Sequence, residues 1–251
     1  MTSNSWFITY KKNPTKKVNL FCFHHSGGGA STFYPWLDHL SPSIEMIAIQ
    51  LPGRETRFTE KLINKLDEVL ENLSEGFNAL KETPFFLFGH SLGGLLAYEF
   101  AKKVYENYSI SPKHLIISGR KAPHMPNRMQ GLSTLSDESL KEKLKLYDGV
   151  DDKILHNEEL LDIFLPIIRS DFSISEMYNN PEILPLPCNI THLSGKDDQT
   201  INQQEIMEWK KYTTRNFKSL TFNGGHFFIK NNQNDIIRYI NDIVVSEFSI
   251  S

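Results

Sequence analysis

The sequence predicts an α/β fold in which a mostly parallel sheet is flanked by helices. Short apolar runs alternate with amphipathic segments along most of the chain, and this alternation is typical of a parallel sheet with helical crossovers. One apolar run, Phe85 to Phe88, leads into the glycine-flanked Ser91 and then into an apolar helix. Between about Pro123 and Pro187 the strand signals stop, which indicates an all-helical insertion.

The expected strands and helices follow one another in a regular order. Strands are expected at 18–23, 45–50, 85–88, 114–118, 189–194 and 217–222, and helices at about 62–80, directly after Ser91, and at about 137–147, 158–168, 203–212 and 235–246. The insertion at about 123–187 would lie outside the carboxyl ends of the strands, where a lid over an active site belongs. We therefore expect a single domain, residues 1–251, that carries a helical lid.

Length and composition are those of an ordinary globular protein. The 251 residues are 39% hydrophobic and 23% charged, and the formal net charge of −3 argues against a nucleic-acid-binding surface. Cys22 and Cys188 adjoin apolar runs, so both are expected to be reduced core thiols. The sequence contains neither a secretion signal nor a run of 18 apolar residues, which favours a cytoplasmic protein without a membrane partner. We expect a monomer.

Ser91 stands in a G-x-S-x-G motif at the point where a predicted strand meets a predicted helix. Gly89 and Gly93 occupy the two positions where a sharp strand-turn-helix elbow leaves no room for a side chain. The elbow would lift the Ser91 hydroxyl out of the sheet edge, and the unpaired N–H of Leu92 in the first helical turn would face a developing oxyanion. The alternative is a glycine-rich turn without chemistry.

An acid and a histidine follow the serine in the chain order of the α/β-hydrolase triad. Asp197 and Asp198 come after one predicted strand, and His226 comes after the last one. A serine needs a histidine to accept its proton, and the histidine needs a carboxylate to hold its tautomer. The turn that begins at Gly195 favours its fourth residue, Asp198, while the neighbouring Asp197 stays open as the acid.

Two further loops that follow predicted strands contain residues suited to a site, a glycine-rich loop with two histidines and a loop with two arginines. The glycines at 27–29 come after an early strand, where α/β-hydrolases supply a second oxyanion amide. His24 and His25, in front of them, are expected to pack or to anchor the loop rather than to act as acids or bases. Arg54 and Arg57 either bind a phosphate or carboxylate with their planar forks or pair within their own turn.

Several blocks of this sequence together resemble the type II thioesterases that accompany nonribosomal peptide and polyketide synthetases. The blocks are 21–28, 51–54, 88–94, 165–172, 195–198 with Trp209 downstream, and 224–228. The Gly-His-Ser-Leu-Gly-Gly block is shared with other hydrolases, whereas the Pro-Gly-Arg loop combined with the Leu-Pro-x-x-Arg-x-Asp-Phe block is much more particular. The chain departs from the family at His24-His25, where members often have Pro-Phe or Pro-Tyr, and this leaves the shape of the pocket floor open.

The resemblance implies a serine hydrolase with the α/β-hydrolase fold. Ser91 would be the nucleophile, Asp198 and His226 its partners, and the backbone amides of Ser26 and Leu92 the oxyanion hole. The reaction implied is hydrolysis of acyl thioesters on the phosphopantetheine arm of an acyl or peptidyl carrier protein, which removes misprimed or stalled acyl groups. No metal or other cofactor is expected, because the sequence has no H-x-x-x-H, H-E-x-x-H or C-x-x-C spacing and no phosphate-loop Lys-Ser/Thr.

Two other functions would use the same predicted fold. A general carboxylesterase or lipase would turn over free esters without a carrier, and a catalytically inert acyl-binding protein would leave Ser91 unreactive. Docking of an acidic carrier helix would need basic side chains near the pocket mouth. The candidates for this contact are Arg54, Arg57, Arg120 and Lys121.

Overall fold

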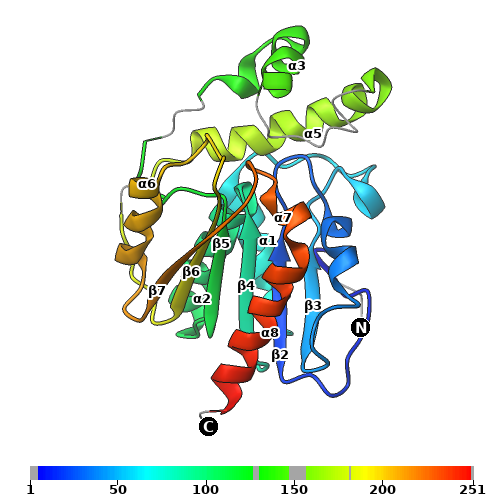
Figure 1. Cartoon of the computed structure of the whole chain (residues 1–251). Coiled ribbons are helices and arrows are strands. Elements are labelled where there is room, and N and C mark those ends of the chain that lie inside the picture. The colour runs from blue at the N-terminus through cyan, green and yellow to red at the C-terminus, as the bar shows by residue number, and fades with distance from the viewer. Residues whose placement is uncertain (1–4, 127–129, 147–156, 181, 250–251) are drawn as a thin grey trace.

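The computed structural model describes residues 5–126, 130–146, 157–180 and 182–249, and the strands within them form one seven-stranded sheet. The strands are β1 (Phe7–Ile8), β2 (Val18–Phe23), β3 (Ile44–Ile49), β4 (Phe85–His90), β5 (His114–Ser118), β6 (Asn189–Gly195) and β7 (Phe217–Phe222), and their order in the sheet is β1-β3-β2-β4-β5-β6-β7. Only β1 is antiparallel to its neighbour; the other pairs are parallel. The predicted α/β fold is confirmed, and the carboxyl ends of β2 to β7 lie at one edge of the sheet (Figure 1).

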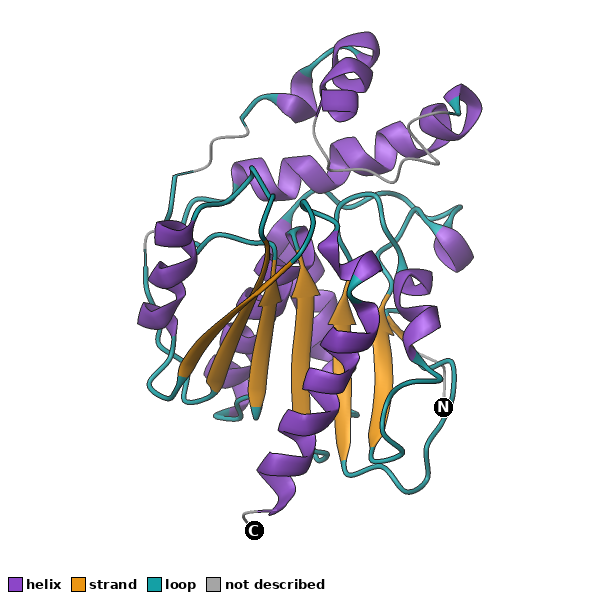
Figure 2. Cartoon of the chain, viewed as in Figure 1, coloured by secondary structure: helices purple, strands orange, loops and turns teal. Residues whose placement is uncertain are grey.

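Helices cover both faces of the sheet and its carboxyl edge (Figure 2). The α-helices are α1 (Leu66–Phe77), α2 (Leu92–Tyr108), α3 (Asp137–Leu146), α5 (Glu158–Met177), α6 (Gln203–Met207), α7 (Phe228–Asn231) and α8 (Gln233–Ser249). Short 3₁₀ segments are η1 (Ala30–Trp36), η2 (Glu55–Arg57), η3 (Leu132–Thr134) and η4 (Glu208–Tyr212). One face packs against α1, α2 and η4, and the other against η1, α7 and α8.

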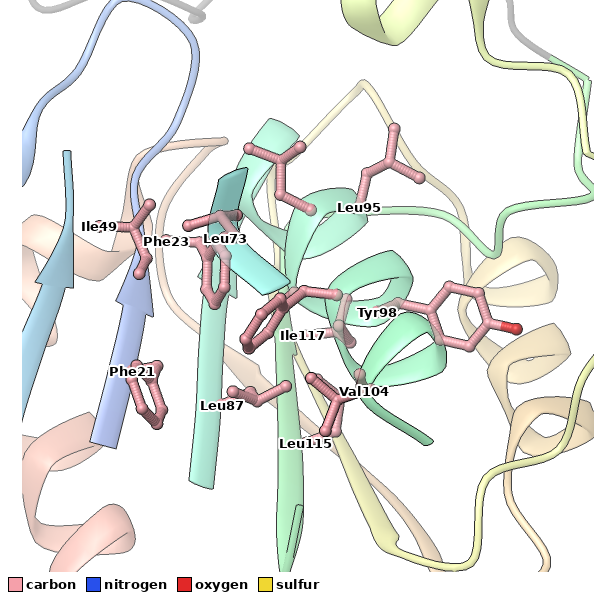
Figure 3. Packing of buried hydrophobic residues seen from close by; sticks show 14 of the residues in the cluster. Phe21, Phe23, Ile49, Leu73, Leu87, Leu95, Tyr98, Val104, Leu115 and Ile117 are labelled. Carbon is pink, nitrogen blue, oxygen red and sulfur yellow. The ribbon is translucent and has the colours of Figure 1, made fainter. Parts of the chain in front are cut away.

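The period of two along each strand builds these two apolar faces. In β2, Phe21 and Phe23 belong to the cluster with α1 and α2, whereas Leu20 and Cys22 belong to the cluster with α8. Figure 3 shows part of the first cluster, in which side chains of β2, β4 and β5 meet those of α1 and α2. A strand buried on both faces reads as a continuous apolar run, and this is why the central strands are recognisable in the sequence.

Between β5 and β6 the described residues form η3, α3 and α5, which lie above the carboxyl ends of the strands (Figure 1). In this stretch the described part of the chain holds no strand beyond an isolated bridge between Leu186 and Thr213. α3 packs on α5 through a separate apolar cluster that includes Leu140 and Leu161, whereas Ile174 near the end of α5 joins the core beneath. α5 therefore connects the top layer to the body of the molecule.

Several elements differ from the sequence-based expectation. The helix expected at about 62–80 is shorter, Leu66–Phe77, and the two larger differences are an extended helix and an additional strand. The helix expected at 158–168 runs on to Met177 although Pro166, which lacks an N–H and disfavours a helix interior, stands inside it. Asn157 caps its first turn by accepting the N–H of Leu160 at 3.0 Å, and its apolar residues continue beyond the proline, so tertiary packing sustains the longer helix. β1 was not expected, because two residues are too short for a periodic signal. No described helix combines the length and the apolar character that crossing a membrane requires.

Candidate active site

Ser91 occupies a strained elbow between β4 and α2. Its backbone has φ 56° and ψ −116°, its N–H donates to the carbonyl of Ser118 at 2.8 Å, and its own carbonyl accepts the N–H of Gly94 at 3.0 Å. A Cβ at Gly89 would lie 2.0 Å from the carbonyl oxygen of Gly93, and a Cβ at Gly93 would lie 2.1 Å from that of Phe23. The motif glycines are therefore required for strand and helix to approach so closely, as the sequence predicted.

The strand register collects the other predicted residues at the same edge. His90 pairs with Ser118 and Ser118 with Leu193, while β6 and β7 run two residues further to the Gly195–Phe222 pair, so the segments that follow these strands begin close together at one edge. A Cβ at Gly195 would lie 2.3 Å from the carbonyl oxygen of Gly225, which means that only a glycine lets the β6 and β7 loops touch. The loops that hold Asp198 and His226 are thereby in contact.

Asp198, and not Asp197, is the carboxylate that holds His226. The Nδ1–H of His226 donates to Oδ2 of Asp198 at 2.9 Å, and the Asp198 side chain has no solvent exposure. Oδ1 of Asp198 accepts the Thr200 N–H at 2.9 Å and the Thr200 hydroxyl at 2.6 Å. The Asp197 side chain is exposed, and its backbone N–H donates to the carbonyl of Gly224. The geometry therefore favours Asp198 as the acid.

Hydrogen bonds keep Asp198 ionised in its buried position. Burial by itself raises the pKa of this carboxyl, but the hydrogen bonds and charge from His226 and the two hydrogen bonds from Thr200 outweigh it, so the pKa lies below its ordinary value. An ionised acid at Nδ1 fixes the tautomer in which the other ring nitrogen, Nε2, is the basic one. That is the state in which a histidine accepts a proton from a serine.

His90 lies behind His226, with ring centroids 5.1 Å apart. It is fully buried, its Nδ1 is 2.9 Å from the Ser118 hydroxyl, and burial lowers the pKa of His90 well below its usual range. A neutral imidazole therefore packs against the ring of the candidate base. A Cβ at Gly119 would lie 2.9 Å from the His90 ring and 3.3 Å from the His226 ring. The backbone after β5 therefore packs directly against both rings.

His24 and His25 anchor the glycine-rich loop, as the sequence predicted. Nδ1 of His24 donates to the His25 carbonyl at 2.8 Å, and Nδ1 of His25 donates to the Ser26 carbonyl at 2.9 Å. Burial lowers the pKa of His24 to about 3 and that of His25 to about 4, so both rings are neutral near pH 7. Ser26, whose amide is the predicted oxyanion donor, is itself buried within this loop.

Both arginines of the loop after β3 are buried and paired within the fold, although Arg54 also lines the cavity described below. Arg54 is 3% exposed and forms a two-pronged ion pair with Asp171 of α5, at 2.7 and 2.8 Å. Arg57 is 6% exposed, pairs with Glu60 at 2.6 and 2.9 Å and lies 4.5 Å over the ring of Trp6. Their suggested role in docking a carrier is therefore wrong.

The two other basic candidates for a docking contact also have partners in the fold. Arg120 is half-buried and donates to the Ser175 hydroxyl at 2.7 Å, and burial lowers the pKa of its guanidinium to about 10. Nζ of Lys121 donates to the Pro126 carbonyl at 2.5 Å. The Arg120 carbonyl accepts from His192 and from Trp209, which gives Trp209 a structural role at the start of the insertion.

A cavity of about 420 Å³ lies between the glycine-rich loop, η1 and α5. Its lining is predominantly apolar, and it reaches from the backbone of Gly27 to an exposed rim that includes Lys230. The apolar lining residues are Phe33, Pro35, Trp36, Phe58, Ile163, Phe164, Ile167 and Ile229. Such a space suits an acyl chain better than a charged group.

Three contributors to this region were not assigned a role from the sequence. Thr200 supports Asp198, Asp171 supports the glycine-rich loop, and Lys230 stands at the cavity rim. Asp171 lies in one of the blocks that resemble type II thioesterases, but its partner Arg54 is 117 positions away, so the pairing has no local signal. Among the described residues, no group of three or more His, Cys, Asp or Glu is arranged to hold a metal ion.

Comparison with known proteins places this arrangement in a family. The model of the thioesterase domain matches residues 18–244, which is most of the chain. The chain is 35% identical over 237 residues to the gramicidin S biosynthesis protein GrsT of Aneurinibacillus migulanus, covering 94% of this chain and 93% of that protein. It is 31% identical over 242 residues to thioesterase PikA5 of Streptomyces venezuelae, covering 96% and 85%.

A solved structure supports the same placement at the level of the fold. The type II thioesterase BorB from the borrelidin biosynthetic cluster superposes with a TM-score of 0.87 at 35% identity, covering 96% of this chain and 98% of that one. The chain therefore belongs to the thioesterase domain family and, within it, to the type II thioesterases of the α/β-hydrolase fold.

Proposed function

We propose that this thioesterase hydrolyses acyl groups from the phosphopantetheine arm of carrier proteins and thereby clears misprimed or stalled acyl groups from a peptide or polyketide synthetase. Ser91 is the nucleophile, His226 the general base, Asp198 the acid that orients it, and the backbone amides of Ser26 and Leu92 bind the oxyanion. The observation that carries the assignment is the buried Asp198–His226 hydrogen bond of 2.9 Å beside a strained serine elbow.

The chemistry proceeds in two acyl transfers. Nε2 of His226 takes the Ser91 proton as Oγ bonds to the thioester carbonyl carbon, and the proton passes to sulfur as the C–S bond breaks. The thiol of the arm leaves, and an acyl ester remains on Ser91. A water molecule then gives its proton to His226, adds to the ester carbonyl and releases the carboxylic acid, and the serine hydroxyl is restored.

The acyl chain is assigned to the cavity beneath α5. Its apolar lining and its volume of about 420 Å³ suit a chain of moderate size, and its inner wall is the loop that holds the Ser26 amide. The insertion at about 123–187 acts as the lid over this space, since α3 and α5 lie above the carboxyl edge of the sheet (Figure 1). The residues 127–129, 147–156 and 181 of this predicted lid fall outside the described residues.

A carrier-bound substrate is supported by the names of the relatives. GrsT is a gramicidin S biosynthesis protein, and BorB comes from the borrelidin biosynthetic cluster. Arg54 and Arg57 are buried, whereas Lys230 is exposed and lines the cavity, so we assign the contact with the arm's phosphate to Lys230. Its ammonium lies 4.5 Å over the ring of Phe227.

The decisive measurement compares kcat/KM for one acyl group on a carrier protein and on a short thiol. Binding of the remote carrier and arm stabilises the transition state only in the first case, so we expect a ratio of at least about ten, equivalent to roughly 1.4 kcal/mol. Equal values, together with rapid turnover of free esters, would make the protein a general esterase. Failure of a fluorophosphonate probe to label Ser91 would make it an inert acyl-binding protein.

Lys230 is tested in the same assay. Lys230→Ala is expected to lower kcat/KM about tenfold for the carrier-bound acyl group and to leave the short-thiol substrate unchanged, because only the carrier-bound form presents a phosphate. Lys230→Arg, which keeps the charge, is the matched control and is expected to retain most of the activity. Equal losses on both substrates would remove Lys230 from the carrier contact.

A further inference from the structure

Asp171 joins α5 to the glycine-rich loop. Its carboxylate has no solvent exposure, and its Oδ2 accepts the backbone N–H of Gly27 at 2.8 Å. The same oxygen accepts from Arg54 at 2.7 Å, while Oδ1 accepts from the other end of the guanidinium at 2.8 Å. One buried carboxylate from the layer above the sheet therefore contacts both the loop after β2 and the loop after β3.

Arg54 holds the same loop from the other side. Its guanidinium donates to the Gly28 carbonyl at 3.0 Å, and its own carbonyl accepts the Gln50 side-chain amide at 3.1 Å. Oε1 of that amide in turn accepts the N–H of Ala30 at 2.9 Å. The loop from Gly27 to Ala30 therefore makes three hydrogen bonds that involve Arg54 directly or through one of its partners. Their partners are Asp171, the Arg54 guanidinium itself and Gln50.

The peptide unit between Ser26 and Gly27 is fixed at both ends. Its carbonyl accepts from His25 at 2.9 Å, and its N–H donates to Asp171. Gly27 has φ +75°, and a Cβ there would lie 2.8 Å from Ile168 of α5, so the loop is pressed directly against the helix. The Ser26 N–H belongs to the preceding peptide unit, whose His25 carbonyl accepts from His24 at 2.8 Å and from the Gly28 N–H at 3.0 Å. With the peptide units on both sides of the Ser26 Cα held in this way, the direction of the Ser26 N–H depends on the bonds to Asp171 and Arg54 that keep the loop in place.

Stability alone does not account for a buried ion pair at this place. Removing two charges from water costs several kcal/mol, and well-packed apolar residues of similar volume often stabilise a fold as well or better. What apolar residues lack is the set of directed hydrogen bonds to the Gly27 N–H and the Gly28 carbonyl. The Arg54–Asp171 pair therefore fixes the orientation of the loop backbone at Gly27 and Gly28, which stabilising the fold alone would not require.

We infer that Arg54 and Asp171 are positioning residues for the oxyanion hole, and that α5 must be seated on the sheet for the Ser26 amide to point at the substrate. The inference rests on the proposed function, in which the Ser26 amide binds the oxyanion. Through Asp171 the helix above the site and the donor within it form one unit. Displacement of this part of α5 then disassembles the catalytic site as well as uncovering it.

The test replaces the pair by apolar residues. Arg54→Met/Asp171→Leu keeps volume without charge, and it is expected to fold but to unfold at a lower urea concentration than wild type, because the Gly27 N–H and the Gly28 carbonyl lose their partners. Its kcat on a free short-chain thioester is expected to fall about 100- to 1000-fold with little change in KM, as for loss of one oxyanion donor. The rate of Ser91 labelling by a fluorophosphonate is expected to fall in parallel, since that reaction also develops an oxyanion.

The matched control removes another ion pair of the same helix. Arg169 of α5 pairs with Asp137 of α3 at 2.6 Å, and neither contacts the glycine-rich loop through the hydrogen bonds described. Arg169→Met/Asp137→Leu is expected to keep kcat within about threefold of wild type. A folded Arg54→Met/Asp171→Leu protein with wild-type kcat would overturn the inference.

A second variant covers the case in which the double substitution does not fold. Arg54→Lys leaves a charge opposite Asp171, but its compact ammonium lacks the planar fork that contacts both Asp171 oxygens and the Gly28 carbonyl, so kcat is expected to fall about tenfold with KM unchanged. A folded Arg54→Lys enzyme with wild-type kcat would equally overturn the inference. If the folded wild-type chain neither hydrolyses thioesters nor labels at Ser91, the proposed function fails first and the inference with it.

Discussion

The backbone of Ser91 adopts a conformation that residues with a Cβ rarely occupy. A φ of 56° with a ψ of −116° costs of the order of 1–3 kcal/mol and persists only where the surroundings impose it. Here the hydrogen bonds to Ser118 and Gly94 impose it on both sides of the residue. Strain held at one serine, at the end of a buried strand, is what an exposed nucleophile requires.

Removal of the Ser91 hydroxyl is expected to abolish turnover. Ser91→Ala should lower kcat by about 10⁴ to 10⁶, as in other serine triads, with the far-ultraviolet circular dichroism unchanged. Ser91→Gly should be equally inactive but more resistant to urea than Ser91→Ala by about 1 kcal/mol, because glycine tolerates a positive φ. Activity of Ser91→Ala within tenfold of wild type would exclude Ser91 as the nucleophile.

The two neighbouring aspartates provide a comparison within one turn. Asp198→Asn should lower kcat by about 10⁴, because an amide beside Nδ1 stabilises the wrong histidine tautomer. Asp197→Asn changes an exposed side chain and should leave kcat close to wild type. Steady-state kinetics of the two variants on one thioester decide between them, and a larger loss in Asp197→Asn would reverse the assignment.

At the scale of single residues, the sequence predicted those site residues whose position follows from a local pattern. Ser91, Asp198 and His226 each follow a recognisable strand, so their approach to one edge was foreseeable from the parallel arrangement. The role of Arg54 was not, because its fork is equally suited to a bound anion and to Asp171, and the choice depends on a contact across 117 positions. The sequence therefore predicts which kinds of group Arg54 can bind, but not which group it binds in the folded chain.

The close packing of α2 on the end of β2 gives a test at the level of the element. Gly93→Ala would place a Cβ 2.1 Å from the Phe23 carbonyl oxygen, and we expect it to destabilise the fold by more than about 2 kcal/mol. Gly131→Ala is the control: its φ is +80°, but its Cβ would meet nothing closer than 3.9 Å, so the cost should be about 1 kcal/mol. Urea unfolding measures both, and equal costs would argue against steric contact at the elbow.

The two helices above the sheet are expected to differ in protection from hydrogen exchange. α3 contacts α5 through the separate cluster with Leu140 and through partly exposed ion pairs, whereas the second half of α5 is anchored to the body of the molecule by Asp171 and Ile174. Amides of α3 should therefore exchange faster than those of β4, and amides of 168–177 should approach the protection of the sheet. Equal protection of α3 and β4 would count against a gating role for this part of the proposed lid.

Element boundaries show where sequence patterns stop being informative. The central strands are continuous apolar runs and were located to within one or two residues. The end of α5 was not, because a proline at 166 is a local stop signal that only packing against the core overrides. The helix expected at 203–212 is an α-helix to Met207 and a 3₁₀ segment beyond it, a difference too small for side-chain spacing to reveal.

For the whole molecule, five histidines with lowered pKa values make stability dependent on pH. Burial lowers the pKa of His24 to about 3, lowers those of His25, His114 and His192 to about 4, and lowers that of His90 well below 6.5. Between about pH 6.5 and pH 4 the unfolded chain therefore binds protons that the native chain does not. Each such histidine then removes up to about 1.4 kcal/mol of stability per pH unit of acidification.

The expected result is a urea midpoint that falls steadily from pH 7 to pH 4.5. Replacement of one buried imidazole, as in His192→Gln, should lower the dependence of stability on pH by up to one proton, whatever it does to stability at pH 7. Gln204→Ala, which removes an exposed side chain that does not titrate, is the control and should leave the slope unchanged. A midpoint independent of pH over this range would mean that the buried rings are protonated in the native state.

The burial of both cysteines bears on the fate of the acyl group. Cys22 is completely buried and Cys188 is 2% exposed, and burial raises the pKa of the Cys22 thiol well above its usual value and that of Cys188 to about 12. A surface thiolate would exchange with a thioester or form a mixed disulfide with the thiol that hydrolysis sets free. In the proposed reaction, the acyl group therefore has no enzyme thiolate to transfer to, and the released thiol finds no exposed sulfur on the enzyme with which to form a mixed disulfide.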